Sequence, residues 1–148
     1  MVSSYFHLPH AGHMEYIAKA RELAGPDGLV YAIVNNEHQC VLKKGFCFMP
    51  DKDRLAIISN LRNVDKAFLS IDTDRSCCKT IQMICDTEEH HPTIWYNDAD
   101  VNTATKCPEE GVCALNGIEL KYGTSTKVQS STWIFEHSVK KAYEVMFS

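Results

Sequence analysis

Residues 29–34 read Leu-Val-Tyr-Ala-Ile-Val, an unbroken apolar run with the length of a single β-strand. A strand that is apolar at every position has to bury both faces, which favours the centre of a parallel sheet with helices on both sides. Another short strand is predicted at residues 1–6. Between the two, residues 12–24 have the spacing of a helix, which Gly25-Pro26-Asp27-Gly28 ends. The three segments predict a β-α-β unit around which the rest of the chain has to pack.

The remainder of the chain continues this alternation. Further strands are predicted at 66–71, 93–97 and 118–122, and further helices at about 50–62, 72–85, 108–117 and 131–146. The last of these helices is expected to pack through Ile134, Val139, Ala142 and Met146, whereas Lys43, Lys44 and Gly45 are expected in a loop. The pattern contains no internal repeat or linker and predicts a single α/β domain over residues 1–148. Ligands of open α/β sheets bind at the carboxyl ends of the strands.

Charge and composition exclude several classes of protein. Nineteen acidic and fifteen basic residues give a net charge of −4, which disfavours a nucleic-acid or anionic-membrane surface. No apolar run is long enough to cross a membrane, and the first residues lack the charged start and apolar core of a signal peptide. Seven cysteines without Cys-x-x-Cys spacing indicate buried thiols rather than disulfides or a structural zinc site. We therefore expect a cytoplasmic protein that binds neither nucleic acid nor a membrane.

A pair of histidines indicates chemistry at the point where the first strand leads into the first helix. His10 and His13 lie three residues apart, so they share a helix face, and Gly12 stands between them. Free N–H groups and the helix dipole favour an anion there, and Gly12 would let a phosphate approach the backbone closely. Two other hypotheses stay open. The histidines are ordinary loop residues, or His7, His10 and His13 bind a metal ion, since imidazole is the usual zinc ligand.

The stretch Ser4-Tyr5-Phe6-His7-Leu8-Pro9-His10-Ala11-Gly12-His13 resembles the signature of the HxGH nucleotidyltransferase superfamily. The nearest pattern in that family runs Gly-x-Phe-Asp/Asn-x-x-His-x-Gly-His. Ser4 stands in place of the glycine and His7 in place of the Asp or Asn. The resemblance is strongest to the cytidylyltransferase-like group. It implies a Rossmann-like, open, mostly parallel five-stranded sheet with helices on both faces.

Two further segments match that family's cationic positions. In the family, a lysine of the loop after the second strand binds a phosphate, which implicates Lys43 or Lys44. The segment 49–65 resembles the second signature, an Arg-x-x-Ile/Leu-Leu helix that leads into Arg-x-Val-Asp, and it supplies Arg54 and Arg62. Guanidinium groups suit phosphate because their donors fork onto two oxygens.

The second half of the chain matches the family more weakly. Residues 127–134 resemble the closing motif Ile-Ser-Ser/Thr-Thr/Ser-x-Ile at a helix N-terminus, with Gln129 in place of the first isoleucine. Asn97-Asp98-Ala99-Asp100 stands where relatives have a Gly-Gly-Asp or Gly-Asp-Asp loop, and Asp100 is the best match there.

The resemblance assigns a role to each of these residues. It implies catalytic contacts from His10, His13, Lys44 and Arg62, and contacts to the substrate phosphate from Lys43 and Arg54. It implies a metal contact from His7, and nucleotide contacts from Ser4, Tyr5, Phe6, Gly12, Asp100, Gln129, Ser130, Ser131 and Thr132.

The function implied is transfer of CMP or AMP from CTP or ATP to a small phosphorylated acceptor, such as a polyol or sugar phosphate, with release of pyrophosphate. The resemblance also implies Mg²⁺ carried mainly by the triphosphate, and a homodimer. A nucleotide-binding regulatory protein of the same fold that has lost catalysis is the first alternative, because several positions depart from the pattern. A histidine-based metal-binding protein is the second.

Overall fold

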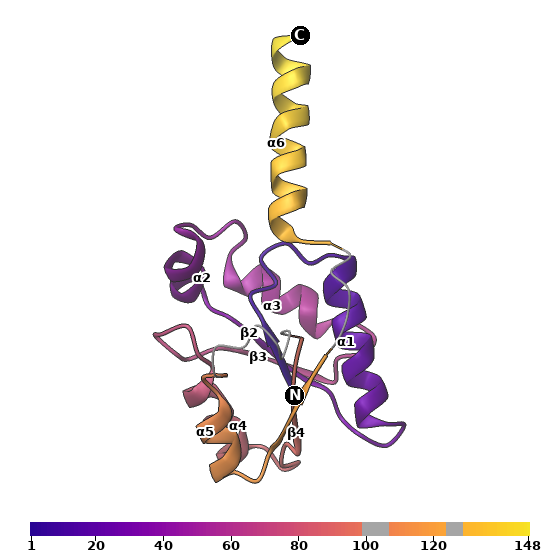
Figure 1. The fold of residues 1–148 in the computed structure, drawn as a ribbon, viewed down its shortest axis with the longest axis vertical. Helices are drawn as coiled ribbons and strands as arrows, with labels where there is room; N and C mark the ends of the chain where they lie inside the picture. Colours follow the sequence, from indigo (N-terminus) through magenta and orange to yellow (C-terminus); the bar gives the residue numbers. More distant parts are fainter. Residues whose placement is uncertain (99–106, 124–128) are drawn as a thin grey trace.

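The computed structural model describes residues 1–98, 107–123 and 129–148. Each strand and helix expected from the sequence is present, and there is one further helix (Figure 1). The strands are β1 (Val2–Ser4), β2 (Tyr31–Val34), β3 (Lys66–Leu69), β4 (Ile94–Asn97) and β5 (Glu119–Tyr122). The helices are α1 (Ala11–Ala24), α2 (Glu37–Lys44), α3 (Asp51–Ser59), α4 (Cys78–Thr87), α5 (Glu110–Leu115) and α6 (Ser131–Phe147).

The five strands are parallel within two ladders, β1-β2-β3 and β4-β5, rather than in the single five-stranded sheet that was expected. The ladders meet at Met1, whose nitrogen donates to the Ile94 carbonyl at 2.8 Å and whose carbonyl accepts from the Tyr96 N–H at 3.0 Å. This is the hydrogen-bond pattern of one parallel bridge between β1 and β4. A strand of three residues, such as β1, has room for few further bonds of this kind. The spatial order is therefore β3-β2-β1-β4-β5. The order reverses between β1 and β4, which is where open α/β sheets bind their ligands.

Alternation along β2 explains how both faces of the sheet are covered. Val30, Ala32 and Val34 belong to one apolar cluster, which also contains Ile17 of α1 and Ile58 of α3. The residues between them, Tyr31 and Ile33, belong to a second cluster together with residues of α4, β4 and α5. In Figure 1, α1 and the pair α4 and α5 accordingly lie on opposite sides of the strands. The expected Rossmann-like α/β class, with helices on both faces, is confirmed.

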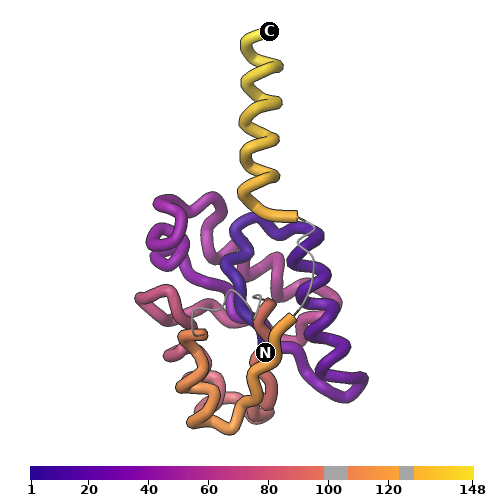
Figure 2. Tube along the Cα trace, viewed as in Figure 1, coloured from indigo at the N-terminus to yellow at the C-terminus, as the bar shows by residue number. Residues whose placement is uncertain are grey.

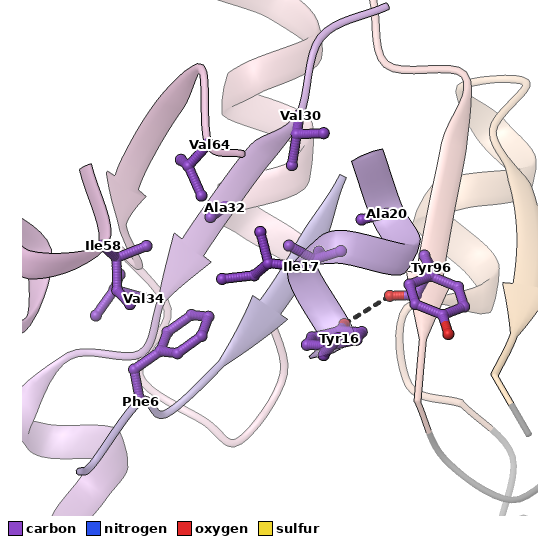
Figure 3. Close-up of a cluster of buried hydrophobic side chains, with 11 residues drawn as sticks. Phe6, Tyr16, Ile17, Ala20, Val30, Ala32, Val34, Ile58, Val64 and Tyr96 are labelled. Atoms are coloured by element: carbon purple, nitrogen blue, oxygen red, sulfur yellow. Dashed lines mark hydrogen bonds between the residues drawn. The ribbon is translucent and has the colours of Figure 1, made fainter. Parts of the chain in front are cut away.

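The first cluster also ties α1 to β4 across the point where the strand order reverses. The buried Tyr16 hydroxyl donates to the Tyr96 carbonyl at 2.7 Å, and the two rings lie 5.3 Å apart (Figure 3). Phe6 and Ile17 fill the space between this pair and β2, and both are essentially inaccessible to solvent. The start of α1 is therefore held at a defined position beside the carboxyl ends of β1 and β4.

Helix α2 was expected to be a loop. It buries only Gln39 and Cys40, so it lacks the apolar stripe that marks a helix in a sequence. Its ends are nevertheless well defined. Asn36 and Gln39 form a reciprocal capping box, and Gly45 closes the helix with φ of 82°. These end signals identify α2 better than its hydrophobic pattern does.

Arg54 of α3 is completely buried, and it does not face a phosphate site. Its Nη1 donates to the carbonyls of Tyr5 and Asn35, both at 2.6 Å, and its Nε donates to the Met49 carbonyl at 2.9 Å. These three carbonyls lie at the ends of β1 and β2 and just before α3. The guanidinium therefore joins three segments, and the structure places Arg54 inside the fold rather than where the prediction expected a contact with a substrate phosphate.

The C-terminal helix α6 differs most from expectation. None of its residues is buried, and Val139 and Met146 are 52% and 74% exposed. Figure 2 shows that α6 projects away from the rest of the molecule and contacts it only at its start. Its expected apolar face therefore has no counterpart in the described part of the chain. Among the described residues, no helix combines the length and apolar character that a membrane-spanning segment requires.

We expect Arg54→Met to lower the free energy of unfolding by about 3 kcal/mol or more, because it removes a buried guanidinium that donates to the buried Asn35 carbonyl and to two partly buried carbonyls. Arg62→Met is the matched control. Arg62 lies on the surface of the same segment, and its replacement should change stability by no more than about 0.5 kcal/mol. Urea unfolding of both variants measures the difference. Equal stability of the two would contradict the structural role of Arg54.

Candidate active site

A cavity of about 510 Å³ opens where the strand order reverses, at the carboxyl ends of β1 and β4. The N-termini of α1 and α6 and the end of α2 complete its wall. The volume is in the range of small-molecule sites. Its lining residues are Ser3, Ser4, Tyr5, Phe6, His7, His10, Gly12, His13, Glu15, Tyr16, Lys43, Lys44, Asn97, Asp98, Gln129, Ser130, Ser131 and Thr132.

The two histidines of the motif cap α1 with their own side chains. His10 Nδ1 accepts from the Gly12 N–H at 3.1 Å, and His13 Nδ1 accepts from the His10 N–H at 3.2 Å. This is a capping box built from imidazoles. A nitrogen that accepts from a backbone N–H carries no proton, so each neutral ring has its proton on Nε2. Both rings therefore present an Nε2–H donor, and they stack with centroids 3.9 Å apart.

Gly12 is required by this arrangement. A Cβ at this position would lie 2.9 Å from His10 Cε1 and 3.3 Å from the Gln129 carbonyl oxygen. The His10 ring and the start of α6 therefore both approach the backbone where a side chain would stand. The capping bonds therefore explain why the two histidines are three residues apart, and the close approach of the His10 ring and the Gln129 carbonyl explains why glycine stands between them.

The electrostatic environment keeps His13 neutral. Burial and, to a smaller extent, the neighbouring His10 together lower the pKa of His13 to about 3. The ring also packs against Phe6, with centroids 5.0 Å apart. His13 therefore acts as a neutral donor of one hydrogen bond across the physiological pH range.

The backbone turns sharply between β1 and this cap. Phe6 has φ of 45°, a left-handed conformation that a large side chain rarely adopts. Full burial of the Phe6 ring and the bond from Arg54 to the Tyr5 carbonyl stabilise the turn. Strain of this kind clusters at functional sites. Here it directs the chain from the end of β1 towards the segment that carries the histidines.

His7 is buried between Phe46 and Phe48. Its Nε2 accepts from the Phe48 N–H at 3.1 Å, so the proton of the neutral ring is on Nδ1, which has no partner among the described residues. Burial lowers the pKa of His7, and Lys44, Arg54 and Lys43 add to the effect. Neither nitrogen of the neutral ring offers a lone pair, so the structure does not support the predicted metal contact of His7. The described residues contain no group of three metal-binding side chains.

Lysines and hydroxyls bring α2 and α6 together over the motif. Lys44 Nζ donates to Thr132 Oγ1 at 3.3 Å, and Lys43 Nζ lies 4.2 Å from the centre of the Tyr5 ring. The Ser131 hydroxyl exchanges two bonds of 3.2 Å with the backbone of Leu8. The residues predicted here, including Ser130 as the N-cap of α6, therefore gather in one place.

Two predicted residues are not part of the cavity. Arg54 is the buried connector described above. Arg62 is exposed and follows α3 just before β3 begins, at the end of the sheet opposite the histidines. Asp65, three residues further on, pairs with Arg21. Asp100, the predicted nucleotide contact, lies outside the described residues.

Five lining residues were not among the predicted ones: Ser3, Glu15, Tyr16, Asn97 and Asp98. Asn97 and Asp98 end β4, and a position at the carboxyl end of a strand was the signal that could have identified them. Asp98 approaches Gly123 closely, because a Cβ there would lie 2.5 Å from the Asp98 carboxylate.

The donor set fits a magnesium ion that arrives with a triphosphate. Mg²⁺ usually takes one or two protein carboxylates together with phosphate oxygens and water. Glu15 and Asp98 are the carboxylates among the described lining residues, so they are the groups that would hold such an ion.

Comparison with known proteins gives a consistent result. A family model described as "Cytidylyltransferase-like" matches residues 3–138. A solved structure, the lipopolysaccharide core biosynthesis protein from Thermoplasma volcanium GSS1, superposes with a TM-score of 0.63 and 19% identity. It covers 87% of this chain and 96% of that one, and at this identity it shows the likeness of the fold.

Curated relatives are archaeal FAD synthases. That of Methanobrevibacter ruminantium is 31% identical over 74 residues, 50% of this chain and 49% of the relative. That of Methanothermus fervidus is 31% identical over 84 residues, 57% of each chain. The chain thus spans about half the length of the curated relatives it matches.

We expect His13 to make stability depend on pH. Its folded pKa of about 3 lies below the unfolded value of 6.5, so the unfolded state binds a proton first as the pH falls. Stability should therefore decline below pH 6.5 by up to about 1.4 kcal/mol per pH unit from this residue. His13→Asn keeps an acceptor for the His10 N–H and should flatten that slope. Urea unfolding between pH 7.5 and 4.5 tests it.

The exposed His137 on α6 provides the control. His137→Asn should leave the pH dependence of stability as it is in the wild type. If His13→Asn also leaves the slope unchanged, His13 is not held neutral in the folded protein.

Proposed function

Because the chain belongs to the cytidylyltransferase-like family, we propose that it transfers a nucleoside monophosphate from a nucleoside triphosphate to a small phosphorylated acceptor and releases pyrophosphate. The observation that carries the proposal is the pair of stacked imidazoles, each fixed by the backbone so that Nε2–H is its donor. The two imidazoles stand at the N-terminus of α1, and the N-terminus of α6 borders the same cavity.

The reaction needs positioning more than covalent help from the protein. An oxygen of the acceptor phosphate attacks the α-phosphorus in line, and the bond to the pyrophosphate breaks. Charge on the non-bridging and leaving oxygens then has to be stabilised. His10 and His13 would donate to these oxygens without changing protonation state. A bound Mg²⁺ would neutralise part of the phosphate charge.

The two helix ends divide the remaining work. The start of α6 supplies the Thr132 hydroxyl and the positive end of its dipole, which suits the triphosphate tail, while Ser131 holds this end of the helix to Leu8. Lys44 adds a cation at the same place. Tyr5, whose ring is covered by Lys43, borders the cavity on the β1 side, where an acceptor phosphate could meet Lys43.

ATP is the first donor to test, and FMN the first acceptor. The relatives are named FAD synthases, and an FAD synthase joins an adenylyl group to FMN. Polyol and sugar phosphates with CTP are the second set, in keeping with the family description. A homodimer is part of the same proposal.

Nucleotide binding without catalysis is the second candidate. The observation that favours it is the cation content of the cavity, because no arginine lines it among the described residues and its cations are Lys43 and Lys44. Guanidinium groups are the usual strong partners of phosphate. A site without them still binds a nucleotide, but offers less stabilisation of the transition state.

We expect pyrophosphate release from ATP or CTP with at least one phosphorylated acceptor, and we expect Lys44→Met to lower kcat/KM about 10²-fold. Lys66→Met is the control, because Lys66 is the first residue of β3 and pairs with Glu88 at the opposite end of the sheet. Binding of nucleotide by calorimetry with no turnover for any acceptor would favour the second candidate. The absence of both would exclude the proposal.

We expect Gly12→Ala to lower kcat/KM about 10- to 100-fold while the protein still folds, because the added methyl displaces the His10 ring and costs at most its cap on α1, about 1 kcal/mol. Gly111→Ala is the matched change in α5, where a Cβ meets nothing within 4 Å. It should leave activity unchanged. Full activity of Gly12→Ala would show that the position of His10 does not matter to the reaction.

A further inference from the structure

Helix α6 carries an apolar surface that the described part of the chain leaves uncovered. Along the helix, large apolar side chains recur every three or four residues, so they line one side of it. We call this set the apolar stripe: Phe135, Val139, Tyr143, Met146 and Phe147, which are between 38% and 74% exposed.

The stripe begins beside the candidate active site. The Phe135 ring lies 5.8 Å from the rings of both Phe46 and Phe48, which in turn contact His7. From there it runs towards the C-terminal end of α6, where the tilted rings of Tyr143 and Phe147 have centroids 4.6 Å apart. A groove beside it is lined by Phe135, Val139 and Tyr143 together with Glu136, Lys140 and Glu144.

A helix of this kind requires a partner. Isolated helices of about this length are marginal in water, and their stability in proteins comes from packing of the apolar face. Yet α6 is well formed over 17 residues with no residue buried. The stripe and the two phenylalanines at its start expose roughly 100 Å² of apolar surface each, about 700 Å² in all. That exceeds the few hundred Å² that monomers usually expose in one patch.

We propose that the homodimer, which is part of the proposed function, forms through this stripe, so that α6 of a second copy covers it. Two such surfaces would bury about 1,400 Å², within the range of about 1,200–2,000 Å² for stable interfaces. The charged residues of α6 are Glu136 and Glu144 and the two lysines Lys140 and Lys141, so its charges balance. Balanced charge suits a second copy, whereas an anionic lipid surface selects a basic polar face.

The two helices pair antiparallel about a twofold axis. Phe46 and Phe48 of the body contact Phe135 at the start of the stripe, so the body lies on the stripe side of α6 and parallel pairing would bring two bodies into the same space. Antiparallel pairing places the bodies at opposite ends. It also brings Met146 and Phe147 of one copy to the cluster of Phe46, Phe48 and Phe135 in the other, so that the second copy completes the wall next to His7.

Light scattering on the full chain tests the proposal. We expect twice the 16.7 kDa mass of one chain at micromolar concentration, and a melting temperature that rises with protein concentration. Small-angle scattering should give the two-peaked distance distribution of separated bodies. A mass of 16.7 kDa up to 100 µM, a mass above two chains or a single-peaked distribution would each overturn it.

A matched pair of substitutions places the contact on the stripe. Val139→Asp should convert the protein to single chains, whereas His137→Asp puts the same charge on the opposite side of α6 and should leave the dimer intact. Circular dichroism checks that both variants keep their fold. A dimer that survives Val139→Asp overturns the proposal. Vesicles of phosphatidylcholine and phosphatidylserine test a membrane as the partner instead: if the wild type binds them and Val139→Asp does not, the proposal is also overturned.

Discussion

The buried guanidinium of Arg54 is the interaction on which the site depends. Three carbonyls from the ends of β1 and β2 and from the segment before α3 accept its hydrogen bonds. Those segments carry Phe6, with its strained backbone, and Phe48, whose N–H fixes the tautomer of His7. Without the guanidinium, these three segments would lose the donor that joins them, and the buried Asn35 carbonyl would lose its bond from Arg54. A cation therefore organises the place where an anionic ligand is expected.

Neutral imidazoles beside fixed cations give the cavity its chemical character. Burial lowers the pKa values of His7 and His13, and neighbouring cations lower that of His7 further. The rings therefore donate hydrogen bonds without carrying charge, while Lys43 and Lys44 supply the charge. Three backbone N–H groups select the donor nitrogens, by occupying His10 Nδ1, His13 Nδ1 and His7 Nε2. This arrangement suits phosphate oxygens and leaves no imidazole lone pair for a metal ion.

Helix α6 links the cavity to the surface that we assign to a second copy. Its first turn bonds to Leu8 and Lys44, and Phe135 contacts the loop that holds His7. The rest of the helix extends away from the body. Any contact that fixes its direction also fixes one wall of the cavity, because the same rigid helix carries both.

The sequence by itself determined the α/β class, the positions of the five strands and the histidine pair, because apolar periodicity and a rare local motif are properties of neighbouring residues. It also placed Lys44 and Ser130 to Thr132 in the site, through their resemblance to family signatures. Only the tertiary structure decided that Arg54 is a connector, that Arg62 lies at the far end of the sheet, that Asp98 lines the cavity and that α6 stands uncovered. These facts depend on which distant segments meet, and two arginines of the same chemical type look alike until their neighbours are known.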